Sequence, residues 1–298
     1  MKILFYGRNC AAFYENHLDW WLAAPEKLGY TWALNGKFAD AVEKMFGLSI
    51  PPENRYTSVT GEDVRRGSVM IAVGGDGTFL EAVHELRGLP MPVVGINLGR
   101  MGFLAQIKPF EVERAISDIL AGRYTLERRT MLTVEGDFPA GNVPDFPCAL
   151  NEFTLHRHTA DMISVAIYSR TGELLTVVRG DGAIASTPTG STAYAMSAGG
   201  PIVTPDCACL VYLGIAPHNF SIRPFVVPDS TVITVEVRSR GHEVLASLDN
   251  QSFIVGDGAR FTIKKSEFPV FLIRLQNISF YDTLRDRTMW GMDRRDNF

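Results

Sequence analysis

The sequence predicts an α/β amino-terminal domain, built on a parallel Rossmann-like sheet, followed by a β-rich carboxy-terminal domain. Up to about residue 121, short apolar runs alternate with segments of helical period, the pattern of a parallel sheet covered by helices. From about residue 122, single apolar residues alternate with polar ones, which is typical of antiparallel strands. We therefore expect one domain at 1–121, with the tail 276–298 packing back on it, and a second at 122–275.

The segments of the amino-terminal half appear in the order that a parallel sheet requires. Continuous apolar runs predict buried strands at 3–6, 69–73 and 92–97. Apolar residues at helical spacing predict helices at 13–28, 37–46, 79–86 and 112–120. Strand, helix, strand and helix in succession favour helices that cover the sheet.

The carboxy-terminal half is expected to be mostly antiparallel sheet. Alternation is clearest at 163–168, 233–238 and 260–264, which we assign to strands. One helix is expected to begin near Gly190, and the polar tail 279–290 to form a short helix and an arm.

Composition and charge limit the classes of function. The 298 residues are 46% hydrophobic and 21% charged, which excludes a disordered chain, a coiled-coil rod and a collagen-like chain. With 29 basic and 33 acidic residues the net charge is -4, so no basic surplus supports binding to nucleic acid. An anionic ligand would have to be bound by backbone N–H groups, helix N-termini and a few arginines.

The cysteines and the hydropathy indicate a cytoplasmic protein with no membrane partner. The four cysteines (Cys10, Cys148, Cys207 and Cys209) form neither a disulfide framework nor a zinc-ligand pattern. The amino-terminal apolar run is too short for a signal peptide, and no apolar stretch reaches membrane-spanning length.

The first stretch that could bind a ligand is Gly74-Gly75-Asp76-Gly77-Thr78, between a predicted buried strand and a helix. Glycines let backbone N–H groups approach a phosphate, and the helix N-terminus adds a favourable dipole. The loop follows the carboxyl end of its strand, where open α/β sheets bind ligands. The alternative is an ordinary turn with a helix cap. The spacing matches neither the dinucleotide-binding GxGxxG pattern nor the P-loop.

Two further stretches interrupt apolar segments. Asn97 to Leu104 contains two glycines, again follows a predicted strand, and should lie beside the first loop; the alternative is a strand-to-helix turn that needs glycine. Asn151-Glu152 places two polar groups where a bend would direct both at a ligand; the alternative is an ordinary edge position. His156 and His158 have the spacing of one strand face but lack a third metal ligand, which favours solvent-facing side chains.

The longest stretch runs from Arg179 to Pro201 and is dominated by glycine, serine and threonine. Around a turn into a helix, such residues present hydroxyl and N–H groups to a ligand. Tyr194 offers an aromatic face for a base, and Asp181 an acceptor for ribose or amide groups. The alternative is a polar surface loop, or a helix capped by Ser191 with no ligand.

Together these stretches resemble the NAD kinase family, also called ATP-NAD kinases. The resemblance consists of GGDGT at 74–78, NxGxxGFLA at 97–105, the Asn151-Glu152 pair and DGxxxSTPTGSTAY at 181–194. It extends over nearly all of the chain from Val69 onward, whereas residues 1–68 match poorly. One departure is Asp249-Asn250-Gln251, where many members have Asp-Gly-Gln.

The resemblance implies an activity and a set of site residues. Members transfer the γ-phosphate of ATP to the 2′-hydroxyl of the adenosine ribose of NAD, with a divalent metal ion such as Mg²⁺, and they form homodimers or homotetramers. Asp76 would be the catalytic base, and Gly74, Gly75, Gly77 and Thr78 would hold the ATP phosphates. No residue is assigned as a metal ligand. The residues expected to contact the dinucleotide are Asn151, Glu152, Arg179, Asp181, Thr189, Thr192, Ala193, Tyr194, Ser197 and Asp249.

Other functions remain open at this point. A lipid or sugar kinase could use the same glycine loop, but it would not need the Asn151-Glu152 pair or the Ser/Thr/Tyr stretch. A dinucleotide-binding sensor would bind NAD or NADP without turnover, and a purely structural β-protein would leave the glycine loops unexplained. The kinase hypothesis requires that Asp76 and the hydroxyl-rich stretch meet around one adenylate.

Overall fold

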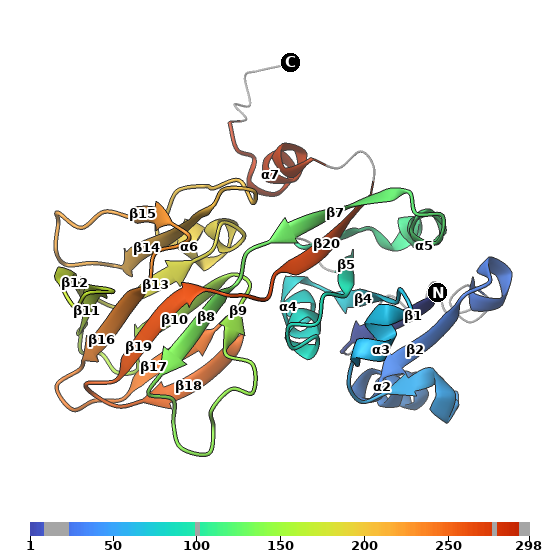
Figure 1. The fold of residues 1–298 in the computed structure, drawn as a ribbon, viewed down its shortest axis with the longest axis horizontal. Helices are drawn as coiled ribbons and strands as arrows, with labels where there is room; N and C mark the ends of the chain where they lie inside the picture. Colours follow the sequence, from blue (N-terminus) through green and yellow to red (C-terminus); the bar gives the residue numbers. More distant parts are fainter. Residues whose placement is uncertain (9–23, 99–101, 276–278, 292–298) are drawn as a thin grey trace. The chain divides into compact units, whose positions relative to one another are not determined.

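The computed structural model describes residues 1–8, 24–98, 102–275 and 279–291, and Figure 1 shows its ribbon. The chain forms two compact units. The first unit comprises 1–128 and 270–298, and the second comprises 129–269. Strands β7 (Tyr124–Arg129) and β20 (Val270–Leu275), which we expected in the second domain, belong to the sheet of the first unit.

The first unit contains a largely parallel sheet. Its strand order is β3-β2-β1-β4-β5-β20-β7, with β6 paired to β5. The remaining strands are β1 (Lys2–Gly7), β2 (Thr31–Asn35), β3 (Arg55–Tyr56), β4 (Val69–Gly74), β5 (Pro92–Asn97) and β6 (Ala105–Ile107). Strands β2 and β3 lie on one side of β1, and β4 and β5 on the other, so the strand order reverses beside β1. In such sheets the ligand crevice lies at the carboxyl ends of the strands next to this reversal, where the loops after β4 and β5 begin.

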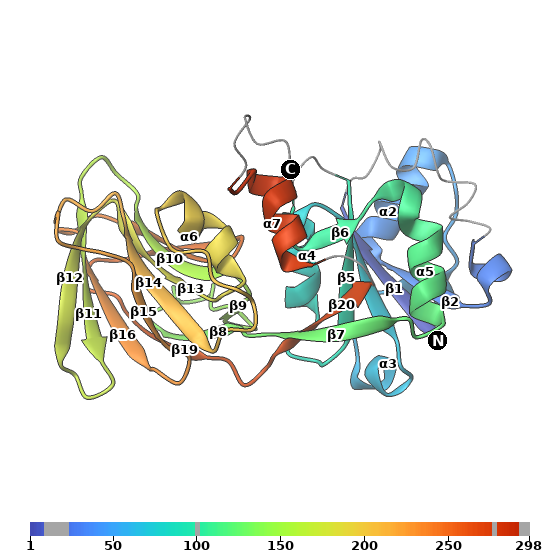
Figure 2. The ribbon, with the colours of Figure 1, turned by 90° about the horizontal axis from the view of Figure 1, so that it is seen from above.

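Helices cover both faces of this sheet. Helix α2 (Gly36–Phe46) packs against β1 and β2, α4 (Asp76–Glu85) against β4 and β5, and α5 (Val112–Leu120) against β20. The unit also contains α3 (Gly61–Arg65) and, near the end of the chain, α7 (Phe280–Thr288). Apolar side chains of α2 and α5 share a core with Ile71 and Val73 of β4. Figure 2 shows α4 and α5 on opposite sides of the sheet. Of the helix expected at 13–28, residues 24–28 are helical, and 13–23 lie outside the described residues.

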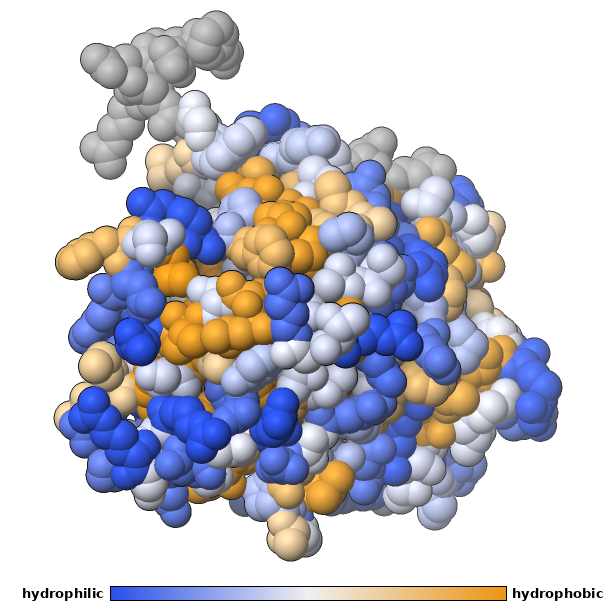
Figure 3. Space-filling model, turned by 60° about the vertical axis from the view of Figure 1, so that its left-hand side comes forward, coloured by the Kyte–Doolittle hydropathy of each residue, from blue (hydrophilic) through white to orange (hydrophobic). Residues whose placement is uncertain are grey.

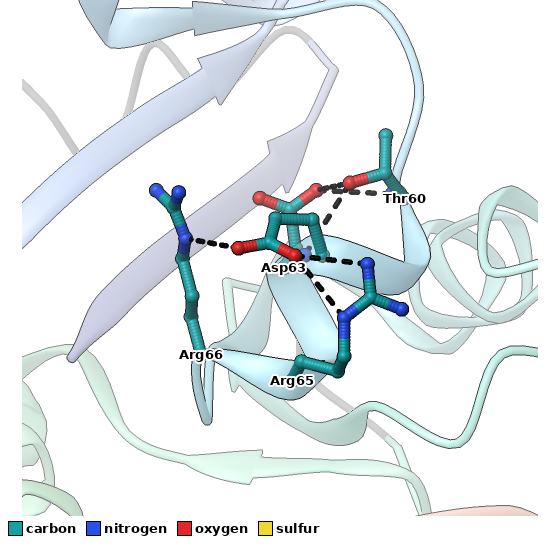
Figure 4. A network of polar contacts seen from close by, with 5 residues as sticks. Thr60, Asp63, Arg65 and Arg66 are labelled. Atoms are coloured by element: carbon teal, nitrogen blue, oxygen red, sulfur yellow. Dashed lines mark hydrogen bonds and ion pairs between the residues drawn. The ribbon is translucent and has the colours of Figure 1, made fainter.

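Helix α3 begins with a reciprocal capping arrangement (Figure 4). The Thr60 hydroxyl oxygen accepts the Asp63 N–H at 3.3 Å, and the Asp63 carboxylate accepts the Thr60 N–H at 3.0 Å. Both Arg65 and Arg66 pair with Glu62. The Asp63 carbonyl then accepts the N–H of Ser68, so this short helix fixes the chain just before β4.

The second unit is a sandwich of two antiparallel sheets, each with six strands. One sheet has the order β15-β14-β13-β10-β17-β18, and its strands are β10 (Glu152–Arg157), β13 (Gly182–Ser186), β14 (Cys209–Ile215), β15 (Phe225–Pro228), β17 (Val244–Leu248) and β18 (Gln251–Val255). The other has the order β12-β11-β16-β19-β8-β9, and its strands are β8 (Leu132–Gly136), β9 (Cys148–Ala149), β11 (Ile163–Ser169), β12 (Leu174–Gly180), β16 (Ile233–Arg238) and β19 (Arg260–Lys265). Apolar side chains from both sheets form one core, which confirms the expected strands at 163–168, 233–238 and 260–264.

The helix expected near Gly190 is broken into two short pieces. A 3-10 turn covers Gly190–Thr192, and α6 covers Tyr194–Ser197. Ala193 separates them, because its backbone (φ −101°, ψ −130°) is not helical.

Candidate functional site

The glycine-rich loop of the first unit leads directly into the first turn of α4. The helix begins at Asp76, three residues earlier than expected, so Gly77 and Thr78 also belong to its first turn. The N–H groups of a first helical turn lack partners within the helix, and the helix dipole favours an anion there. A Cβ atom at Gly75 or Gly77 would meet open space, so the backbone at both positions is accessible. The loop can therefore bind a phosphate through its backbone.

The carboxylate of Asp76 joins this loop to the one that follows β5. Its Oδ2 accepts the N–H of Phe103 at 2.7 Å, and its Oδ1 accepts the N–H groups of Leu104 and Ala105, both at 3.1 Å. A Cβ atom at Gly102 would lie 2.6 Å from Oδ1, so only glycine permits this approach. The expectation that the two loops lie side by side is confirmed for 102–105.

The alternative of a strand-to-helix turn is wrong for the second loop, because the chain next forms strand β6 at Ala105–Ile107. Gly99 and Arg100 of the NxGxxG stretch, with Met101, lie outside the described residues.

In the second unit, residues 150–152 form a bend whose backbone is completely hydrogen-bonded. The three N–H groups donate to the Asp249 carboxylate, at 2.8 Å from Leu150, 2.8 Å from Asn151 and 3.1 Å from Glu152. The carbonyl groups of Leu150 and Asn151 accept from the Thr187 hydroxyl at 2.6 Å and from the Thr187 N–H at 2.9 Å. The Glu152 carbonyl accepts the Asp249 N–H at 3.0 Å. With its backbone satisfied, the bend could bind a ligand through the side chains of Asn151 and Glu152, although both residues are buried here.

Glu152 is an unusual carboxyl group. The residue is 8% exposed, and its Oε2 is buried without a hydrogen-bond partner. Burial, together with the nearby charge of Asp249, raises the pKa of Glu152 to about 8. A buried polar atom without a partner disfavours the folded state unless a ligand supplies one.

The hydroxyl-rich stretch differs from the expectation. We expected its hydroxyl groups to face a ligand, but those of Ser186, Thr187 and Ser191 are fully buried and bind the protein's own backbone. Gly190 packs so closely that a Cβ atom there would lie 2.2 Å from the Asn151 carbonyl oxygen. These small residues therefore let one loop press against the 150–152 bend, which sequence reasoning missed.

Thr189 accepts a hydrogen bond from a buried cation, and Thr192 in turn donates to Thr189. The Nη1 group of Arg129, whose side chain is buried, donates to the Thr189 hydroxyl at 3.1 Å. The Thr192 hydroxyl donates to the Thr189 carbonyl at 3.2 Å. Nothing in the sequence pattern around Arg129 indicated this contact.

Tyr194 is 39% exposed and stands at the start of α6, followed by the exposed Ser197. The pKa of the Tyr194 phenol is raised by partial burial and by the charges of Asp181 and Glu152, so these three side chains share one neighbourhood. Arg157, which sequence reasoning also missed, pairs with Asp181 at 2.7 Å. Ala193, half-buried, lies between Thr192 and this group.

Arg179 is the candidate that lies on the other sheet of the second unit. It is exposed on β12, an edge strand of the opposite sheet, where its N–H donates to Asn219 at 2.9 Å. Within the described residues, no three His, Cys, Asp or Glu side chains come together to hold a metal ion. His158 faces Glu243 at 3.4 Å, and His156 faces a backbone carbonyl at 2.8 Å. None of the described helices is long and apolar enough to cross a membrane.

Comparison with known proteins shows the family. The model of the ATP-NAD kinase N-terminal domain matches residues 33–124, and that of the ATP-NAD kinase C-terminal domain matches 150–275. The NAD kinase of Cytophaga hutchinsonii is 36% identical over 284 residues, 95% of this chain and 94% of its own. The NAD kinase of Bacteroides fragilis is 34% identical over 296 residues, 99% of this chain and 100% of its own.

Solved structures share the fold. The NAD kinase from Archaeoglobus fulgidus, in complex with ATP, has a TM-score of 0.73 and 26% identity, and the match covers 97% of this chain and 99% of that one. Yeast NADH kinase, complexed with NADH, has a TM-score of 0.80 and 22% identity, with 99% and 89% covered. The family models cover more than half of the residues, and the curated relatives align over nearly the full length. This chain therefore belongs to the ATP-NAD kinase family.

Proposed function

We propose that this protein is an NAD kinase, which transfers the γ-phosphate of ATP to the 2′-hydroxyl of the adenosine ribose of NAD to give NADP. The observation that carries the proposal is that each unit contains one site suited to one of the two substrates. The first unit offers a glycine-rich helix N-terminus with Asp76 in its first turn. The second offers the hydrogen-bonded 150–152 bend near an exposed Tyr194. The names of the curated relatives and the ATP complex of the archaeal structure support the same activity.

Phosphoryl transfer needs alignment and charge neutralisation more than covalent help from the protein. The backbone N–H groups of Gly75, Gly77 and Thr78 would bind phosphate oxygens of ATP at the start of α4. Mg²⁺ is commonly held largely by substrate phosphates, and no residue of this chain is assigned as its ligand. When bound, the metal ion neutralises phosphate charge, so it would enter as part of MgATP.

Asp76 is the group that would take the proton of the ribose hydroxyl. Its Oδ1 accepts two backbone N–H groups and its Oδ2 accepts one, so Oδ2 retains more capacity for the incoming hydroxyl. The three N–H donors also fix the direction of the carboxylate before substrate arrives. General base catalysis of this kind accelerates a reaction by about 10²–10⁴-fold.

The second unit would bind the acceptor dinucleotide. The exposed ring of Tyr194 offers a stacking surface for a base, and Asp181 and Glu152 lie near it. The side chain of Asn151, the hydroxyls of Thr189, Thr192 and Ser197, and the backbone of Ala193 would supply further contacts. The proposal requires that this surface direct the 2′-hydroxyl to Asp76.

The central experiment mixes the purified protein with NAD, ATP and Mg²⁺ and follows NADP with an NADP-specific dehydrogenase. We expect NADP formation that depends on all three components. Turnover with a lipid or sugar acceptor but not with NAD would favour the other kinase class. Tight NAD binding without ATP-dependent turnover would favour a sensor. Replacing ATP with other triphosphates or polyphosphate, and NAD with NADH, defines the substrate range.

The variant Asp76→Asn tests the base. The amide cannot take the proton, and its NH2 group would also face a backbone N–H of residues 103–105, so kcat should fall by at least about 10²–10⁴-fold. The dissociation constant for NAD, measured by calorimetry, should change little because the 150–152 bend is untouched. Turnover close to that of the wild type would remove Asp76 from the mechanism.

The proposal includes an oligomer, a homodimer or a homotetramer. Figure 3 shows apolar side chains gathered among charged ones on a face of the second unit. Exposed apolar residues lie on two edge strands of that unit, Leu174 and Leu175 on β12 and Phe225 and Val226 on β15. Exposed edges with apolar side chains favour pairing with another chain. We also propose a cytoplasmic location, which the free thiols of Cys148, Cys207 and Cys209 support.

A further inference from the structure

Asp249 occupies a backbone conformation that is uncommon for residues other than glycine. It is the first residue of the two-residue turn between β17 and β18, and its φ is +50°, in the left-handed region that favours glycine. The next residue, Asn250, is not among the described residues with positive φ. This turn therefore does not require glycine at position 250, whereas glycine would fit the left-handed backbone at position 249.

The contacts of the side chain explain why an aspartate is present there. A glycine would accept none of the three N–H groups of the 150–152 bend. An asparagine could keep the two bonds to Oδ1, from Asn151 and Glu152, but its amide group would face the N–H of Leu150, another donor. Only a carboxylate satisfies all three donors. Strain that persists at a residue with such contacts points to a role for those contacts.

We propose that Asp249 is the positioning residue of the dinucleotide site, acting through the backbone of residues 150–152 without touching the ligand. Both of its carboxylate oxygens already accept backbone N–H groups, and its own N–H donates to the Glu152 carbonyl. Asp249 thereby sets the directions in which the side chains of Asn151 and Glu152 leave the bend. This inference rests on the proposed NAD site and assigns Asp249 a role other than ligand contact.

A second consequence is electrostatic. The charge of Asp249, from the turn, raises the pKa of Glu152, and Glu152 in turn raises the pKa of Tyr194, from α6. Arg129 and Arg157, the cations described above, donate to Thr189 and to Asp181. An ionised Asp249 therefore favours a neutral Glu152, whose carboxyl can donate a hydrogen bond to a ligand.

Three variants test the role of Asp249. Asp249→Gly relieves the backbone strain and removes the carboxylate, and Asp249→Asn keeps the shape but removes the charge. Arg240→Gly is the matched control, since Arg240 is exposed in another turn of the same unit, also left-handed (φ +56°), and has no contact with the bend. A residue that merely forms the turn would tolerate glycine at 249 as well as at 240.

We expect Asp249→Gly to raise KM for NAD by about 10²-fold, since small displacements of positioning groups have effects of this size. Asp249→Asn should have a smaller effect in the same direction. KM for ATP should stay constant in both, and Arg240→Gly should match the wild type. A KM for NAD within twofold of wild type in Asp249→Gly would overturn the proposal. If Asp249→Gly does not fold, a KM for NAD within twofold of the wild type in Asp249→Asn would overturn the proposal.

A measurement without substrates separates this inference from the proposed function. In protein labelled with ¹³C at glutamate side-chain carboxyls, one signal should titrate near pH 8 and be absent from Glu152→Gln. In Asp249→Asn that midpoint should move to lower pH, and the amide NMR signals of residues 150–152 should shift. An unchanged midpoint and unchanged amide signals would overturn the inference, whatever the wild type does with NAD and ATP. Absence of NADP formation alone would overturn only the proposed function.

Discussion

At the scale of single residues, two aspartates use the same contact. Asp76 and Asp249 each accept three consecutive backbone N–H groups from a loop that is distant in the sequence. A carboxylate has only acceptor oxygens, with room for about four hydrogen bonds, so one side chain can satisfy a whole loop. In each unit, the aspartate that the sequence marks as a candidate site residue also fixes the backbone around the proposed site.

Glu152 should make stability depend on pH. Its pKa is near 8 in the folded protein and ordinarily 4.5, so between these values the folded state retains a proton that the unfolded chain releases. Stability should therefore fall as pH rises from about 4.5 to 8, by at most about 1.4 kcal/mol per pH unit, and then level off.

The variant Glu152→Gln tests this prediction, because it keeps a neutral side chain at every pH. Its advantage over the wild type in urea unfolding midpoint should grow from pH 5 to pH 8. Parallel midpoints for the two proteins across this range would show that Glu152 is not protonated in the folded state.

At the scale of elements, the connections depart from the sequence predictions more than the strands do. Strands β4 and β5 and helix α5 match the predicted segments closely. Helix α4 starts earlier because Gly75 serves as its N-cap residue and Asp76 can enter the first turn. The 186–192 loop turns its hydroxyls inward because its close approach to the 150–152 bend buries backbone carbonyls that need donors.

Gly102, in the connection between β5 and β6, permits the contact between two loops. The variant Gly102→Ala would place a Cβ atom 2.6 Å from Asp76 Oδ1 and displace the carboxylate. We expect kcat to fall by about 10²-fold in the NADP assay, with little change in the circular dichroism of the folded protein.

The control for this prediction is Gly256→Ala, where the new methyl group meets open space at an ordinary φ. Its turnover should equal that of the wild type. Full activity in Gly102→Ala would show that the Asp76–Phe103 contact is not needed for turnover.

At the scale of the whole molecule, each unit has its own core, and each holds one part of the proposed site. The exposed edges of the second unit are the surface that a second copy of the chain could cover. Phe220, which is 93% exposed in the loop before β15, adds to the apolar residues on those edges. Burial of such residues between two chains would stabilise an assembly by about 25 cal/mol per Å² of apolar surface.

The double variant Phe225→Lys/Val226→Lys tests the assembly, because lysine on an edge strand opposes pairing. Light scattering after gel filtration should report a dimer or tetramer for the wild type and a single chain for the variant. Phe110→Lys, at an exposed site in the first unit, should leave the mass unchanged. A wild type that is monomeric at micromolar concentration would contradict the proposed oligomer.

The sequence by itself determined the class of each half and the residue stretches of the site. Apolar runs such as Val69–Val73 and alternation such as that at 233–238 reflect local burial, which depends on neighbours along the chain. The glycine loop and the Asn151-Glu152 pair were recognisable because their residue types are unusual in buried segments.

Only the tertiary structure decided which groups meet. Arg129 and Thr189, Arg157 and Asp181, and Asp249 and the 150–152 bend are contacts between residues far apart in sequence. The inward hydroxyls of Thr187 and Ser191 and the raised pKa of Glu152 follow from the same packing. Such features depend on burial and on partners brought close by folding, and no local pattern of residues encodes that proximity.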